Sequence, residues 1–318
     1  MVRFPRKKSI YIFVFLFSFL VWVGYETYDF SARKGCSPLD SDVIDLNISQ
    51  SSPVSLKFIA LGDTGTGDQD QKEIAQAVQK ICTSEGCDFV LMLGDNFYPD
   101  GVDSTEDPFF KKIFEDIYSS TDKPFIAVLG NHDVRKNPLA QVRYSLKSSK
   151  WRMPNLSYQF QAGPARFFAI NSNCHFLAWQ ELKNQISTDS SSEVPPWTFV
   201  FGHHPVYSSG THGDSDLIMR WYWQQFLQNS IDFYLSGHDH ELEHLQRPGE
   251  TSDYVVSGAG GRHYRSPVER AKTRPSQIDS KFVYQDTGFA WFQVNNSQAR
   301  MKFFNAEGQE LYEFSKTK

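Results

Sequence analysis

Short apolar runs alternate with segments of helical periodicity along most of the chain. Residues 71–82 place Ile74, Ala75, Val78 and Ile81 on one helical face, and residues 108–118 show a second helical pattern. Hydrophobic strands separated by helices are typical of an α/β arrangement in which strands are buried on both faces. The predicted strands are residues 56–61, 89–93, 125–129, 167–170, 198–201, 231–235 and 254–257.

The pattern changes in the last part of the chain. Residues 289–294 and 301–304 follow one another without a helical segment between them, which predicts consecutive antiparallel strands. We therefore expect an α/β (α+β) fold in which two β-sheets pack together with helices outside them. Residues 55–318 show no internal repeat, and we predict that they form one domain.

A basic flank and an apolar run occupy the N-terminus. Residues 1–8 are rich in Arg and Lys, and residues 10–23 are apolar except for Ser18. This order is typical of a secretory signal or of an uncleaved signal-anchor. A cleavage site needs small residues near the end of the run, whereas Phe19, Trp22 and Tyr25 are bulky. We therefore favour a transmembrane signal-anchor at residues 9–25, with residues 1–8 as its cytosolic flank and a cleaved peptide as the alternative.

The next segment, residues 26–54, is polar, rich in Ser and Asp and without periodicity, so it is expected to be a stalk. The anchor would hold residues 55–318 on the exported side of a membrane, whether periplasmic, lumenal or extracellular, and cleavage would make them secreted. Such compartments are oxidising, so Cys82 and Cys87 are candidates for a disulfide across a short loop. Free buried thiols remain the alternative.

Composition and charge narrow the possible partners. The chain has 318 residues, 40% of them hydrophobic, and a formal net charge of -5. This balance gives no basic surface for a phosphate backbone, so we expect no nucleic-acid partner. A small phosphorylated substrate fits the composition, and we expect a monomer.

The residues with metal-binding chemistry follow the predicted strands. In open α/β sheets, ligands bind beyond the carboxyl ends of the strands, and a glycine there lets the chain turn sharply. We therefore predict that the side chains after five such glycines converge on one metal site. These turns are Gly62-Asp63, Gly94-Asp95, Gly130-Asn131-His132, Gly202-His203-His204 and Gly237-His238-Asp239-His240.

The donor types suggest which ions the site would hold. Carboxylate and phenol oxygens suit a highly charged ion, whereas imidazole suits zinc, iron or manganese. Tyr98 is close enough to Asp95 on the same loop to reach the same ion, and Asp95 is the candidate for a carboxylate that bridges two ions. Because neighbouring residues of an extended strand point in opposite directions, His238 and His240 should share one face and His204 should point away from the site.

These segments, taken in order, resemble the calcineurin-like metallophosphoesterases. The tyrosine narrows the resemblance to the purple acid phosphatases, and within them to the small tartrate-resistant acid phosphatases. The likeness runs from Ser55 to the C-terminus and implies a four-layer αββα sandwich of two mixed sheets flanked by helices. The segments are GDTG with Asp63, GDNFY with Asp95 and Tyr98, GNHD with Asn131 and His132, GHHP with His203, and GHDH with His238 and His240.

The resemblance also implies roles for these residues. A ferric ion would be held by Asp63, Asp95, Tyr98 and His240. A divalent iron, zinc or manganese ion would be held by Asp95, Asn131, His203 and His238. His132 and His212 resemble the histidines that contact the phosphate and assist the leaving group, so the catalytic residues would be His132, His212 and Asp95.

The implied activity is that of an acid phosphatase, which hydrolyses phosphate monoesters with a metal-bound hydroxide as nucleophile. Its substrate would be a small phosphomonoester or a phosphoprotein. Two alternatives use the same residues: a phosphodiesterase or nucleotide hydrolase with another metal pair, and a redox-active di-iron protein that generates or consumes reactive oxygen species. The chain also differs from mammalian relatives, because Thr211 precedes His212 where they have an acidic residue.

Overall fold

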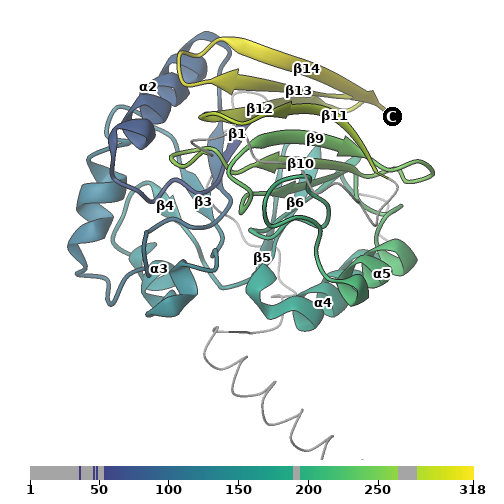
Figure 1. Cartoon of the computed structure of the whole chain (residues 1–318), viewed down its shortest axis with the longest axis horizontal. Coiled ribbons are helices and arrows are strands. Elements are labelled where there is room, and N and C mark those ends of the chain that lie inside the picture. Colours follow the sequence, from purple (N-terminus) through teal and green to yellow (C-terminus); the bar gives the residue numbers. More distant parts are fainter. Residues whose placement is uncertain (1–35, 37–45, 47, 49–53, 189–193, 264–277) are drawn as a thin grey trace, which may run out of the picture.

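A computed structural model of the chain describes residues 36, 46, 48, 54–188, 194–263 and 278–318, and these form two seven-stranded β-sheets (Figure 1). The first sheet contains β1 (Ser55–Leu61), β2 (Phe89–Met92), β3 (Phe125–Ala127), β4 (Trp151–Arg152), β12 (Gly288–Asn295), β13 (Gln298–Asn305) and β14 (Glu310–Thr317). The second contains β5 (Tyr158–Ala162), β6 (Ala165–Ala169), β7 (Trp197–Phe201), β8 (Phe233–Ser236), β9 (Leu242–Gln246), β10 (Asp253–Ser257) and β11 (Asp279–Tyr284).

Both sheets are mixed. The first has the order β14-β13-β12-β1-β2-β3-β4 and the second has the order β11-β9-β10-β8-β7-β6-β5. Strands β1, β2 and β3 are parallel to one another, as are β6, β7, β8 and β10. The carboxyl ends of these parallel strands carry the glycine turns that the sequence singles out.

The core between the sheets is aromatic. Phe58 of β1 stacks on Phe89 and Phe292 within its own sheet, and its ring meets Phe167 and Phe199 of the second sheet edge to face, with ring centroids 5.3 Å apart. Such edge-to-face contacts add to the stabilisation gained by burying apolar area. They confirm the predicted packing of two sheets against each other.

Helices cover the outer faces of the sheets. The α-helices are α2 (Gln69–Ser84), α3 (Pro138–Tyr144), α4 (His175–Thr188) and α5 (Leu217–Phe226), and shorter helical turns are η1 (Phe110–Glu115), η2 (Asp133–Arg135) and η3 (Ser172–Cys174). Helix α2 begins after Asp68, whose Oδ1 accepts a hydrogen bond from the Gln71 N–H, and it buries the predicted apolar face. Helices α4 and α5 pack together on the second sheet (Figure 1).

The helix predicted at residues 108–118 is present over residues 108–115, where the backbone is mainly π-helical, in η1 (Phe110–Glu115). The prediction of the other helices is incomplete. Helices α3, α4 and α5 are absent from the sequence prediction. In α5 the apolar periodicity is obscured because Leu217 and Trp221 are exposed, at 73% and 56%.

Both cysteine pairs form disulfides. Cys82 bonds to Cys87, as the short spacing suggested, and Cys36 bonds to Cys174. The second bond ties a residue of the predicted stalk segment to η3. The predicted anchor at residues 9–25 lies outside the described residues, and within the part that is described no helix is both long and apolar enough to span a bilayer.

Candidate metal centre

Three residues of the predicted ligand set have left-handed backbone conformations. Asp63 has φ 59°, Asp95 has φ 54° and His238 has φ 71°, and they are the only non-glycine residues with positive φ in the described chain. This conformation costs about 1–3 kcal/mol for such a residue and persists only where the surroundings enforce it. Strain that is confined to three predicted ligands points to a functional role for all three turns.

Two glycines make room for the carboxylates between the loops. A Cβ atom at Gly130 would lie 2.1 Å from Oδ1 of Asp95, and one at Gly237 would lie 2.5 Å from Oδ2 of Asp63. Any side chain at either position would therefore displace a carboxylate. The glycines act here through close approach of the backbone to the carboxylate oxygens.

The first donor group consists of Asp63, Tyr98 and His240. The Tyr98 hydroxyl donates to Oδ1 of Asp63 at 2.9 Å, and His240 Nε2 lies 3.5 Å from the same oxygen. Burial alone would raise the pKa of Asp63, but the nearby imidazoles of His203, His240 and His238 outweigh it and hold that pKa at about 2. Burial, and then the charges of Asp63 and Asp95, raise the pKa of the Tyr98 phenol far above its ordinary value.

The second donor group consists of Asn131, His203 and His238. His203 Nε2 lies 3.0 Å from Oδ1 of Asn131 and 3.1 Å from Nδ1 of His238. Asp95 lies next to this group, with Oδ2 3.5 Å from His203 Nε2. Asp63, Asp95 and His203 each offer a ligand atom within 4.8 Å of the others, so Asp95 connects the two donor groups.

The protonation of His203 shows how well the second group fits a cation. Its Nδ1 lies 2.9 Å from the carbonyl oxygen of Leu93, which can only accept, so Nδ1 carries a proton. In the neutral ring the lone pair of Nε2 then faces the oxygens of Asn131 and Asp95. Metal-binding histidines usually donate their other N–H to a carbonyl or carboxylate in this way.

The electrostatics favour positive charge at the same point. Burial lowers the pKa of His203, but the charges of Asp95 and Asp63 outweigh it and raise that pKa above its ordinary value. The two groups together present carboxylate, phenol, amide and imidazole donors, which match the preferences of iron, zinc and manganese. The residues therefore fit two cations that share Asp95.

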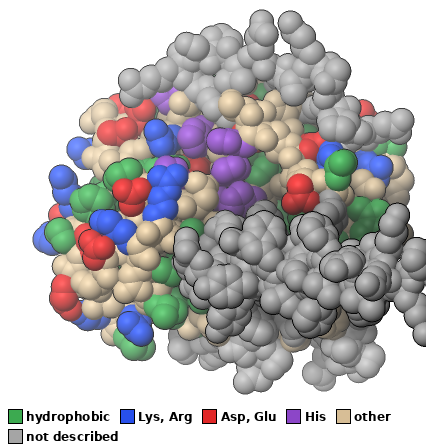
Figure 2. All heavy atoms as spheres, turned by 60° about the horizontal axis from the view of Figure 1, so that its bottom comes forward, with side chains coloured by type: hydrophobic (Ala, Val, Ile, Leu, Met, Phe, Trp, Pro, Cys, Tyr) green, Lys and Arg blue, Asp and Glu red, His purple; other side chains and the backbone are tan. Residues whose placement is uncertain are grey.

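His132 and His212 lie at the mouth of this centre. The His132 Nδ1 donates to the carbonyl oxygen of Pro99, which leaves Nε2 facing Asp95 with 3.9 Å between Nε2 and Oδ2. The ring of His212 lies 4.1 Å from that of His238 and is exposed. Figure 2 shows histidine side chains gathered on one face of the molecule, with Lys and Arg side chains beside them.

Two buried aspartates hold the loops in place, and the sequence patterns assign neither of them a role. Asp133 accepts hydrogen bonds from the backbone N–H groups of Gly130, Asn96 and Phe97, and so joins the second and third turns. Asp239 accepts from the backbone N–H of His212 at 2.8 Å. Both lie inside the segments GNHD and GHDH, and that position is the signal that could have found them.

The prediction that His204 points away from the site is wrong. Its ring lies 4.6 Å from that of His238, and its Nδ1 bonds to the Ser172 hydroxyl at 2.9 Å. Strand β7 ends at Phe201 and the chain turns at Gly202, so the alternation of strand residues no longer applies at His204. Arg262, which no motif marks, lies with its guanidinium 4.5 Å from the centre of the Tyr98 ring.

Comparisons with known proteins agree with this geometry. The family model described as calcineurin-like phosphoesterase matches residues 56–242. Purple acid phosphatase 7 of Arabidopsis thaliana is 29% identical over 296 residues, which cover 85% of this chain and 89% of that protein. Tartrate-resistant acid phosphatase type 5 of Homo sapiens is 30% identical over 302 residues, which cover 81% of this chain and 90% of that protein.

Two solved structures have a similar fold. GAP50, described as the anchor in the inner membrane complex of Plasmodium, superposes with a TM-score of 0.70 at 27% identity, covering 82% of this chain and 88% of that one. PhoD superposes with a TM-score of 0.53 at 12% identity, which shows the fold alone. The chain therefore belongs to the calcineurin-like phosphoesterases and, within them, to the purple acid phosphatase family of phosphoric monoester hydrolases.

Proposed function

We propose that the protein is an acid phosphatase that hydrolyses phosphate monoesters at a centre of one ferric and one divalent ion. The observation that carries this proposal is the convergence of two donor groups on the shared carboxylate of Asp95. Asp63, Asp95, Tyr98 and His240 would hold the ferric ion. Asp95, Asn131, His203 and His238 would hold a divalent iron, zinc or manganese ion.

When bound, such a pair of ions neutralises phosphate oxygens and lowers the pKa of a water molecule. The protein holds the ligand atoms of the two donor groups in fixed positions. The strained turns at Asp63, Asp95 and His238 are supported by the sheets, so the donor atoms are in place before substrate arrives. Preorganisation of this kind reduces the rearrangement needed during the reaction.

The leaving alcohol needs a proton, and two histidines are placed to supply it. His132 is oriented by its bond to the Pro99 carbonyl, so that Nε2 faces the centre. His212 lies beside His238 and is accessible to solvent. In the protonated form, either imidazole can act as the general acid.

Acidic conditions keep the proton on the general acid. A bound pair of ions would lower the pKa of water, so that hydroxide would remain available at acidic pH. We expect kcat/KM for a phosphate monoester to be highest on the acidic side of neutrality. A pH–rate profile of the metal-loaded protein tests this expectation. A maximum well above neutrality would contradict the assignment of an acid phosphatase.

Three rival functions use the same fold. A phosphodiesterase or nucleotide hydrolase with another metal pair would turn over a diester at least as well as the corresponding monoester. A redox-active di-iron protein would oxidise substrates with peroxide even when molybdate blocks phosphate release. GAP50 is described as an anchor, and a protein with that role alone would release no phosphate from any ester.

We also propose that the catalytic domain lies on the exported side of a membrane, held by the segment at residues 9–25. The disulfides Cys36–Cys174 and Cys82–Cys87 support an oxidising compartment. Fractionation after alkaline carbonate washing tests the anchor. Release of the protein into the wash would overturn it in favour of a cleaved, secreted form.

A further inference from the structure

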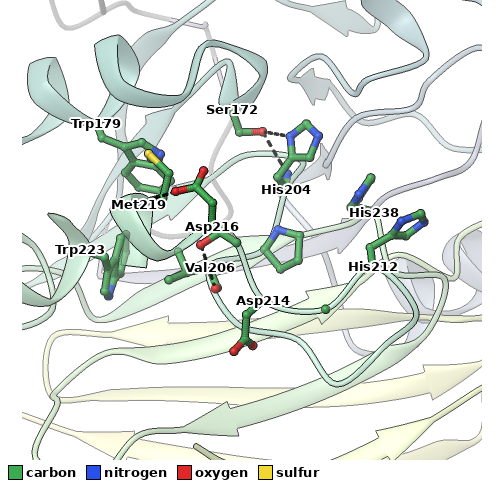
Figure 3. A pocket seen from close by; sticks show the side chains of 13 residues that line it. Ser172, Trp179, His204, Val206, His212, Asp214, Asp216, Met219, Trp223 and His238 are labelled. Carbon is green, nitrogen blue, oxygen red and sulfur yellow. Dashed lines mark hydrogen bonds between the residues drawn. The ribbon is translucent and has the colours of Figure 1, made fainter. Parts of the chain in front are cut away.

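The candidate general acid His212 lies on the long loop that connects β7 to α5, residues 202–216. The loop folds back on itself, because the backbone N–H of Ser208 donates to Oδ1 of Asp214 at 3.1 Å. His212 lies within this turn, and its ring is next to that of His238 (Figure 3). A loop without regular structure does not hold a catalytic group in place by itself. The contacts between this loop and the sheets therefore determine where the imidazole lies.

A buried glutamate, Glu243 of β9, makes such contacts. Its Oε2 accepts the backbone N–H of Ser209 at 2.8 Å. Its Oε1 accepts the hydroxyl groups of Ser209 and of Ser280, the latter at 2.7 Å. Ser280 belongs to β11, so one carboxylate joins the loop of His212 to two neighbouring strands of the second sheet.

The environment of Glu243 indicates that the carboxylate is there for these hydrogen bonds. The residue is 0% exposed, and its partners directly across the sheet are the apolar Val256 and Val283. A glutamate is almost never fully buried without partners, because removing its charge from water is costly. An apolar side chain would pack here without that cost. What it could not supply is the set of charge-assisted bonds to the two serines.

The next residue of β9 does not take part in holding the loop. Neighbouring strand residues point to opposite faces of a sheet. His244 accordingly bonds to Asp253 and to the Tyr312 hydroxyl, each at 2.9 Å, and Tyr312 belongs to β14. Glu243 therefore serves the loop face of β9, whereas the network of Asp253 serves the other face.

Glu243 acts next to a second carboxylate that binds the same loop. Asp239 accepts the Ser208 hydroxyl and the backbone N–H of His212. Ser208 and Ser209 are adjacent, so Glu243 fixes the position of the segment that Asp239 contacts. Without Glu243, the loop would be attached to this part of the sheet through Asp239 alone.

A candidate metal ligand on the same loop is held separately. His203 Nδ1 donates to the Leu93 carbonyl oxygen at 2.9 Å, and its backbone N–H donates to the Ser172 hydroxyl at 3.1 Å. Loss of the Glu243 carboxylate should therefore displace His212 and leave His203 in place.

We propose that Glu243 is a positioning residue, which holds the loop so that the His212 imidazole reaches the oxygen of the leaving group. The inference rests on the phosphatase activity and on the general-acid role proposed above for His212. Glu243 does not touch the substrate, and it acts through Ser209. It should therefore matter most for esters whose leaving group needs a proton. An aliphatic alcohol needs one, whereas 4-nitrophenolate is a stable anion that leaves without it.

The test compares kcat/KM of the metal-loaded protein for ethyl phosphate and for 4-nitrophenyl phosphate. We expect Glu243→Ala to lower kcat/KM by about 100-fold for ethyl phosphate, because misplacing a catalytic group by about 1 Å can cost that much. For 4-nitrophenyl phosphate the loss should be less than about fivefold, and the metal content should not change. Glu243→Gln offers an oxygen to the Ser209 N–H and an amide to the hydroxyl groups, so both activities should stay within about threefold.

Two further variants separate positioning from a loss of stability. Asp253→Ala is the matched control, because it also removes a buried carboxylate of the second sheet but has no bond to the loop. It should leave the ratio of the two kcat/KM values unchanged. Ser209→Ala removes one hydroxyl group, which the fold should tolerate, and should lower kcat/KM about fivefold for ethyl phosphate alone.

Hydrogen exchange gives a measurement that does not depend on activity. The amide groups of residues 208–213 should exchange about tenfold faster in Glu243→Ala than in the unmodified protein, because the loop loses its bonds to β9 and β11. Asp253→Ala should leave their exchange unchanged.

The outcomes distinguish the two proposals. Equal losses for the two esters in Glu243→Ala, or no loss for either, overturn the positioning role and leave the phosphatase intact. If Glu243→Ala does not fold, the same comparison is made with Ser209→Ala. If the unmodified protein hydrolyses no monoester, the phosphatase is overturned. Unchanged exchange of residues 208–213 would then overturn the positioning role as well, and faster exchange would support it.

Discussion

The backbone N–H of His212 donates a 2.8 Å hydrogen bond to Oδ1 of Asp239, the residue that separates His238 from His240. The Ser208 hydroxyl bonds to the other oxygen of the same carboxylate. The approach is close, because a Cβ atom at Gly210 would lie 2.4 Å from the Asp239 carboxyl carbon. One buried carboxylate therefore sets the distance between the candidate general acid and the strand end that carries two candidate ligands.

We predict that Asp239→Ala lowers kcat by about 100-fold while the protein keeps its metal ions, because misplacing a catalytic group by about 1 Å can cost that much. Asp239→Asn retains an acceptor for the His212 N–H, so its kcat should stay within about tenfold of that of the unmodified protein. Steady-state kinetics and metal analysis on the same samples test both variants. If Asp239→Ala and Asp239→Asn are equally active, Asp239 does not position His212.

The close approach of Gly130 to Asp95 gives a second prediction. Gly130→Ala places a methyl group where Oδ1 of Asp95 now lies, so the protein should retain fewer than two metal ions per chain. Gly249→Ala is the control, because Gly249 has φ +85° and nothing lies within 4 Å of its added Cβ. It introduces backbone strain without touching the site. Full metal content in Gly130→Ala would contradict the proposed role of Asp95.

The buried carboxylate of Asp253 and the partly buried ammonium of Lys316 form an ion pair that predicts how stability depends on pH. Asp253 accepts from Lys316 Nζ and His244 Nε2, each at 2.9 Å. Burial raises the pKa of Asp253, but the hydrogen bonds from His244 and Lys316 outweigh it and hold that pKa below 3.8. Because the folded pKa is depressed, this carboxylate stabilises the fold above pH 3.8, and the contribution is lost as the pH falls through the folded value.

Asp253→Asn should therefore lower the free energy of unfolding by about 2 kcal/mol at pH 7, since it leaves the partly buried Lys316 ammonium without its partner charge. Below pH 3.8 the difference in the free energy of unfolding between Asp253→Asn and the unmodified protein should shrink. Urea denaturation at pH 7 and pH 3 measures both values. A difference that is the same at the two pH values would mean that Asp253 acts through packing alone.

The two disulfides should contribute unequally to stability. Cys82 and Cys87 are 5 residues apart, whereas Cys36 and Cys174 are 138 apart. Loop-closure entropy predicts that the free energy of unfolding falls by about 2 kcal/mol in the Cys82→Ser, Cys87→Ser double variant. The corresponding fall for the Cys36→Ser, Cys174→Ser double variant is about 5 kcal/mol. Thermal unfolding under non-reducing conditions compares the two. Equal losses would show that the Cys36–Cys174 bond constrains the unfolded chain less than its length suggests.

The sequence contains most of the information on the fold and the candidate site. The apolar runs locate the parallel strands, and the glycines after them identify turns that the structure brings together. Contacts across the fold cannot be predicted in this way. The segment GHDH marks Asp239 but not its hydrogen bond to His212, and no local pattern indicates that Cys36 bonds to Cys174 or that Arg262 lies over the Tyr98 ring. His204 was mispredicted because strand alternation was extended past a glycine turn.

The visible absorption spectrum of the purified, iron-replete protein, with metal analysis on the same sample, tests the central claim most directly. Tyr98 donates to Asp63 inside the first donor group, so we predict a broad tyrosinate-to-iron charge-transfer band and two metal ions per chain. The band should disappear in Tyr98→Phe. A colourless protein that holds two zinc or manganese ions and no iron after oxidation would contradict the ferric site.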